Sequence, residues 1–136
     1  MIQRIQTLYL LVAGMLLVLF AAFSNLWSTG VAENMTWLEP VGLGLAGLAA
    51  AISFGAAVLY KDRKRQRSII RVAQIVVLLV VAVAITALFM REPTGTVASG
   101  AYLLALAPLV AYVVLRLAQR GVDKDIALVR SMDRLR

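Results

Sequence analysis

Cysteine and histidine are both absent from the 136 residues of this chain. Without cysteine, the chain forms no disulfide and offers no thiolate as a nucleophile or metal ligand. Without histidine, it lacks the side chain that most often transfers protons near neutral pH and most often binds metals. We therefore expect no metal site and no cofactor, and we nominate no catalytic residue.

Charged residues are missing from the middle of four long apolar runs, at residues 5–27, 41–60, 69–90 and 97–117. Each run has about 20 residues, the length of a helix that crosses a hydrocarbon core of roughly 30 Å. A helix satisfies its own backbone hydrogen bonds in lipid, so each run should be a transmembrane helix. The first run is longer than the core of a signal peptide and lacks a cleavage site, so we expect it to be retained.

Short connections separate the four runs, so consecutive helices should form an antiparallel four-helix bundle over residues 1–120. The predicted fold class is an all-α membrane protein. Residues 121–136 should form a separate, short amphipathic helix in the cytoplasm, because Gly121 is typical of a helix end and Asp123 of a helix start. Whether this tail helix lies on the membrane or binds a protein stays open.

Basic residues are concentrated on one side of the predicted bundle, and of the 14 Lys and Arg residues only Arg91 falls on the other side. Because basic residues accumulate in cytoplasmic loops, both termini should be cytoplasmic. The densest cluster is the loop from Lys61 to Arg67, which should attract anionic lipid. An acidic protein is an alternative partner. Nucleic acid is not expected, because no aromatic residues alternate with the charges to stack on bases.

The predicted spans hold few polar groups. No ionisable residue lies mid-span, which argues against a proton-coupled exporter. Gln74, Thr86 and Pro108 are the positions that could border a cavity for a lipophilic ligand. Their plainer roles are hydrogen bonds between helices for Gln74 and Thr86, and a kink in the fourth helix for Pro108.

Gly47, Ala51 and Gly55 recur every four residues in the second run. Small residues at this spacing let two helices approach closely in lipid. We expect this face to pack against another helix of the same bundle, with an interface to a second subunit as the alternative. A monomer and a symmetric dimer both fit the pattern.

The two ends of the chain carry specific sequence detail, MIQRIQTLYL at residues 1–10 and DIALVRSMDRLR at residues 125–136. Both resemble the ends of a family of small four-helix membrane proteins from Bacteroidota that is labelled a domain of unknown function. That family often has an acidic pair where this chain has Asp125 and Ile126. The resemblance implies a location in the bacterial inner membrane and no assigned activity, and it suggests that the cytoplasmic ends matter more than the spans.

These observations favour a non-enzymatic membrane protein that acts as an accessory or scaffold subunit. The alternative is a small transporter or carrier of a lipophilic ligand. An enzyme acting on lipid or quinone would need convergent polar groups, and the sequence offers none to nominate. The predicted contact surface with a protein partner consists of Gln3, Arg4, Gln6, Arg130, Ser131, Asp133 and Arg134.

Overall fold

The computed structural model describes residues 2–23, 35–90 and 103–133, and these residues form four long helices. The helices are α1 (Ile2–Phe23), α2 (Leu38–Val58), α3 (Arg63–Phe89) and α5 (Ala107–Asp133). Each is long and apolar enough to cross a membrane, which confirms the prediction of four such helices. Of the predicted link at residues 28–40, residues 28–34 lie outside the described residues, as does the whole predicted link at residues 91–96.

In α1, α3 and α5, one series of buried residues follows a spacing that alternates between three and four. In α1 they are Gln6, Leu10, Ala13, Leu17 and Phe20. The series in α3 runs from Gln66 to Ala87, and the series in α5 runs from Ala111 to Asp125. This period of 3.5 residues keeps one narrow seam of a helix turned toward its neighbours, as in bundles with a shallow crossing angle.

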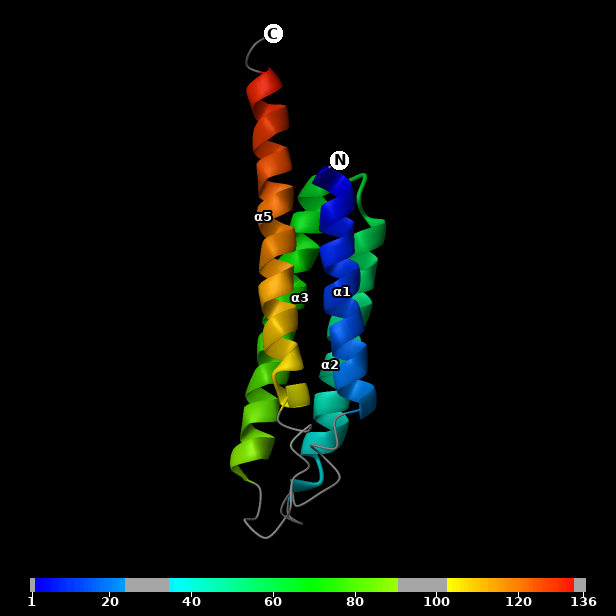
Figure 1. Cartoon of the computed structure of the whole chain (residues 1–136), viewed down its shortest axis with the longest axis vertical. Helices are drawn as coiled ribbons and strands as arrows, with labels where there is room; N and C mark the ends of the chain where they lie inside the picture. The colour runs from blue at the N-terminus through cyan, green and yellow to red at the C-terminus, as the bar shows by residue number, and fades with distance from the viewer. Residues whose placement is uncertain (1, 24–34, 91–102, 134–136) are drawn as a thin grey trace.

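Two clusters of these seam residues form the core, one toward each end of the bundle. The first includes Leu10 of α1 and Ala57 of α2, together with Ile70 of α3 and Val122 of α5. The second lies nearer the end of α1 and contains residues from the first part of α2, the last part of α3 and the start of α5. Helix α1 contacts α2 and α5, and α3 contacts the same two helices, so the four helices close a ring (Figure 1).

Large apolar side chains cover much of the outside of the bundle. Met15 on α1 and Leu48 on α2 are exposed, as are Ile75 on α3 and Val113 on α5. A contiguous apolar surface of this extent is rare on soluble monomers. It is compatible with a surface that faces lipid.

Helix α3 begins at Arg63, earlier than the predicted residue 69, because Asp62 caps it. The Asp62 carboxylate accepts a hydrogen bond from the Arg65 backbone amide at 3.2 Å. An acidic cap satisfies one of the amides that a helix start leaves unpaired. The basic cluster predicted as a loop is therefore mostly the first turns of a helix.

Gly121 does not end the fourth helix, and this prediction was wrong. Helix α5 runs unbroken from Ala107 to Asp133, so the segment after Gly121 is no separate tail helix. The reason is the direction that Gly121 faces, since a Cβ atom there would lie 2.7 Å from Gln6 Cγ. The missing side chain lets α1 and α5 approach, so this glycine serves helix packing and not helix termination.

We expected Pro108 to kink the fourth helix. Instead, the helix is interrupted at Leu106, and Pro108 lies in the first turn of α5. A short helical turn at residues 103–105 precedes α5, and Leu106 separates the two. Proline lacks the amide hydrogen that would bond the carbonyl of Leu104, four residues earlier, so a continuous helix is not formed here.

The far end of α5 extends past the ends of the other three helices (Figure 1). Asp125 is the last buried residue of its seam, and residues 127–132 are all exposed. We call residues 127–133 the α5 projection. It places the end of α5 where no other helix of the described chain covers it.

Candidate functional site

A buried hydrogen bond joins the two helices that carry the described ends of the chain. Gln6 Nε2 of α1 donates to Asp125 Oδ2 of α5 at 3.2 Å. Gln6 is 4% exposed and Asp125 is 8% exposed, so neither is free to contact a partner. Gln6, which we predicted in the contact surface, is therefore part of the bundle interior.

Two further glutamines bond across helix pairs. Gln66 Nε2 of α3 donates to the Ala56 carbonyl of α2 at 3.0 Å, and Gln74 Nε2 of α3 donates to Gln119 Oε1 of α5 at 2.9 Å. All three glutamines that donate, Gln6 among them, lie in the half of the bundle where α5 ends. This end of the core thus adds hydrogen bonds between helices to an apolar cluster, whereas the buried residues of the cluster at the other end are all apolar.

The cavity predicted from Gln74, Thr86 and Pro108 does not form from those residues. Gln74 is paired with Gln119, and the Thr86 hydroxyl donates to the Ala82 carbonyl of its own helix at 2.9 Å. Pro108 lies eleven residues before Gln119 on α5, about 17 Å along the helix axis. The plainer prediction, a hydrogen bond between helices, is confirmed for Gln74.

A groove rich in basic residues lies between the start of α3 and the α5 projection, with a volume of about 960 Å³. We call it the basic groove. Ile126 and Val129 of α5 form its apolar wall, and among the described residues Asp62 is its one acidic lining residue. Its basic lining residues are Lys61, Arg63, Lys64, Arg67, Arg71 and Arg130. The sequence singled out the loop from Lys61 to Arg67, but not the contribution of α5, which is distant in the chain.

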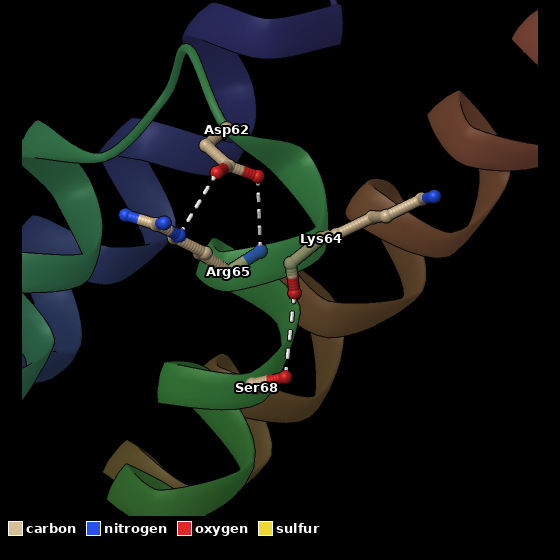
Figure 2. A network of polar contacts seen from close by, with 4 residues as sticks. All are labelled: Asp62, Lys64, Arg65 and Ser68. Atoms are coloured by element: carbon tan, nitrogen blue, oxygen red, sulfur yellow. Dashed lines mark hydrogen bonds and ion pairs between the residues drawn. The ribbon is translucent and has the colours of Figure 1, made fainter.

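Two ion pairs organise the charges around the basic groove. Arg67 Nε of α3 lies 2.7 Å from Asp123 Oδ1 of α5, which ties the two walls together below the α5 projection. Arg65 Nε lies 3.2 Å from Asp62 Oδ2, on the same carboxylate that caps α3. Figure 2 shows Arg65 turned toward Asp62 and Lys64 extended away from this pair. Lys64 lines the basic groove and Arg65 does not.

The other residues of the predicted contact surface divide into two groups. Arg130 and Ser131 are exposed on the α5 projection, and the Ser131 hydroxyl donates to the Leu128 carbonyl of its own helix at 2.8 Å. The side chains of Gln3, Arg4 and Asp133, and the whole of Arg134, lie outside the described residues. Among the side chains that the structure describes, Arg130 is thus the predicted contact residue that carries a charge and forms no ion pair with another described residue.

The small-residue face of α2 lies on the outside of the bundle. Gly47 and Ala51 are exposed and Gly55 is partly exposed. A Cβ atom at Gly47 or Gly55 would meet no other atom within 4 Å. The expected packing of this face against another helix of the same bundle was wrong, because the buried seam of α2 runs along Ala46, Ala49, Ser53 and Ala56. An interface with a second subunit stays a prediction.

Close approach inside the bundle uses different glycines. A Cβ atom at Gly14 of α1 would lie 2.7 Å from the Phe54 ring of α2. Gly14 and Gly121 are therefore two glycines of the described chain whose lack of a side chain allows close packing between helices. Neither stands in a repeat of small residues, so the sequence pattern gave no signal for them.

Within residues 2–23, 35–90 and 103–133, no three His, Cys, Asp or Glu side chains come together to hold a metal. The groups that do converge are the charges of the basic groove and the internally bonded glutamines. Neither arrangement pairs a nucleophile with a base. The charges that line the basic groove favour binding of an anion.

The fold and site together define a small four-helix protein with membrane-length apolar helices and a basic groove at one end. The chain belongs to the family described as "Domain of unknown function (DUF4293)", which matches residues 2–135. The resemblance to a family of unknown function is thereby confirmed, while an origin in Bacteroidota stays a prediction. No curated protein and no solved structure matches the chain.

Proposed function

We propose that this protein is a non-enzymatic integral membrane protein that serves as an accessory or scaffold subunit. In this proposal, the four helices cross the bacterial inner membrane as an antiparallel bundle. The end that carries the basic groove and the α5 projection faces the cytoplasm, because basic residues accumulate on that side. Both termini then lie in the cytoplasm, and a larger protein assembly is contacted from there.

The observation that carries the proposal is the continuation of the α5 seam beyond the bundle. Val122 and Asp125 are buried in that seam, and the same alternation of three and four residues continues through Val129 to Met132, both exposed. Leu128 lies beside them and is exposed as well. An apolar seam at this spacing is the pattern by which one helix docks into a groove or onto another helix.

A pair of substitutions on the α5 projection tests the proposal. The full chain would be purified from its native membrane in mild detergent, and the proteins that accompany it identified by mass spectrometry. The variant Leu128→Ser/Met132→Ser should lose those proteins, because it removes two apolar contacts while leaving the basic groove lining intact. Truncation after Arg120 is a poorer test, since it would remove the buried Val122 and Asp125.

The matched control is Leu103→Ser/Met90→Ser, which changes the same residue types at exposed positions toward the other end of the bundle. This control should keep the accompanying proteins. If both variants retain the same set of proteins, or if the unaltered chain is purified alone, the scaffold proposal fails. The carrier alternative has no comparable support, because the three residues predicted to line its cavity do not converge.

A further inference from the structure

The basic groove is positively charged and should therefore bind anions. Six basic side chains line it, against the single carboxylate of Asp62. Five of the six come from residues 61–71, and Arg130 comes from the opposite wall. Like charges gathered in a concave surface repel one another and concentrate anions from solution. A negatively charged ligand in the groove would therefore reduce the repulsion among its basic side chains.

Most of this charge is not neutralised within the described part of the chain. Asp123 pairs with Arg67, and Asp62 pairs with Arg65, which lies outside the groove. The Lys61 ammonium lies 6.0 Å from the centroid of the Tyr60 ring, a contact that leaves its charge in place. No ion pair among the described residues involves Arg63, Lys64, Arg71 or Arg130.

The depth of the groove indicates what kind of anion fits. Arg71 lies just inside the apolar run that starts at Ile69, so it marks the level at which hydrocarbon gives way to headgroups. Ile75 and Leu78 follow on the same face of α3 and are exposed. Ile126 and Val129 give the groove an apolar wall. A phosphate placed near Arg71 would thus have an apolar path for acyl chains directly below it.

We infer that the basic groove binds the headgroup of an anionic phospholipid, with Arg71 at the membrane end of the groove and Arg130 at its outer end both attracting the headgroup. This ligand matches both the charge and the amphipathic lining, whereas an acidic peptide or free phosphate matches the charge alone. The volume of about 960 Å³ is sufficient for a phospholipid headgroup and the first part of its chains. The inference rests on the proposed membrane insertion but requires no protein partner.

Native mass spectrometry of the full chain in mild detergent tests this site. Phosphatidylglycerol should bind more tightly than phosphatidylcholine. The variant Arg71→Gln/Arg130→Gln should weaken phosphatidylglycerol binding by about 30-fold, since each basic residue near the headgroups contributes roughly fivefold. Arg71→Lys/Arg130→Lys should keep most of the affinity, because the charge is retained.

The matched control is Arg116→Gln/Arg120→Gln, which removes two exposed charges from α5 outside the groove and gives the same net charge. It should bind phosphatidylglycerol as the unaltered chain does. Equal losses in both variants would overturn the inference, because overall charge and not the groove would then attract the lipid. Equal binding of the two lipids would overturn it as well.

Two competitors separate the lipid from other anions. Excess inorganic phosphate and an oligoglutamate peptide should both leave phosphatidylglycerol bound, because neither has acyl chains to lie along the exposed apolar surface of α3 below Arg71. Complete displacement by either would overturn the assignment to a lipid. The Leu128→Ser/Met132→Ser variant should bind phosphatidylglycerol normally, so a failure of the scaffold proposal and a failure of the lipid site give different results.

Discussion

Gln6 and Asp125, which are 119 residues apart in the sequence, share a buried hydrogen bond of 3.2 Å. The bond fixes the start of α1 against the last buried turn of α5. Gly121, one turn earlier on α5, leaves the space that the Gln6 side chain occupies. Residues 121–125 are therefore part of the bundle, and only the residues beyond them project from it.

Replacing Asp125 with alanine should lower the free energy of unfolding by about 1–3 kcal/mol, because the buried Gln6 amide would lose its acceptor. Asp125→Asn should keep most of the stability, since the asparagine carbonyl can still accept from Gln6. Unfolding by SDS in mixed micelles, followed by circular dichroism, measures both variants. Equal stability of the alanine variant and the unaltered chain would contradict the buried bond.

Gly121→Ala should destabilise the bundle, whereas Gly47→Ala should not. The new methyl group at position 121 would lie 2.7 Å from Gln6 Cγ, whose amide is held by Asp125. Overpacking of this kind costs about 1–3 kcal/mol, which over most of this range exceeds the roughly 1 kcal/mol that alanine gains over glycine in a helix. At Gly47 nothing lies within 4 Å, so only the gain applies. The same unfolding assay compares them, and a reversed order would refute the packing argument.

The Gln74–Gln119 pair should show coupling in a double-mutant cycle. Either single change to leucine leaves one buried amide unpaired, and so both Gln74→Leu and Gln119→Leu should destabilise the bundle. The double variant should lose less than the sum of the two, by about 0.6 kcal/mol and at most about 1.7 kcal/mol, the average and the maximum measured for hydrogen bonds between membrane helices. Additive losses would show that the bond contributes nothing.

The existence of the four helices was predictable because it depends on local composition alone. Runs such as residues 69–90 contain no charge beyond Arg71, and their length alone selects a membrane-length helix. Their bounds were less predictable. Asp62 starts α3 well before its apolar run, and Gly121 reads as a helix end although it faces Gln6. The start of α3 depends on the hydrogen bond that Asp62 accepts, and the continuation of α5 past Gly121 depends on its contact with Gln6. Composition reveals neither of them.

Only the part of the candidate site that is contiguous in the sequence was predictable. The charges from Lys61 to Arg67 are contiguous in sequence, so their cluster was evident. Arg130 and Val129 join them only because α5 packs against α3 past the ion pair of Arg67 with Asp123. Gln6 did carry a usable signal, because it is in register with Leu10, Ala13 and Leu17. A polar residue on a buried seam indicates an internal hydrogen bond rather than a contact surface.

Cysteine labelling tests the membrane topology on which the account depends. The chain has no cysteine, so each introduced cysteine is a single, unambiguous label site. Arg65→Cys and Ser131→Cys place exposed thiols at the end that carries the basic groove, and Thr36→Cys places one at the opposite end. In intact bacterial cells, a membrane-impermeant maleimide should label Thr36→Cys alone, and all three should be labelled after the membrane is opened. Labelling of Arg65→Cys or Ser131→Cys in intact cells would contradict the proposed orientation, and recovery of the chain in the soluble fraction would contradict membrane insertion itself.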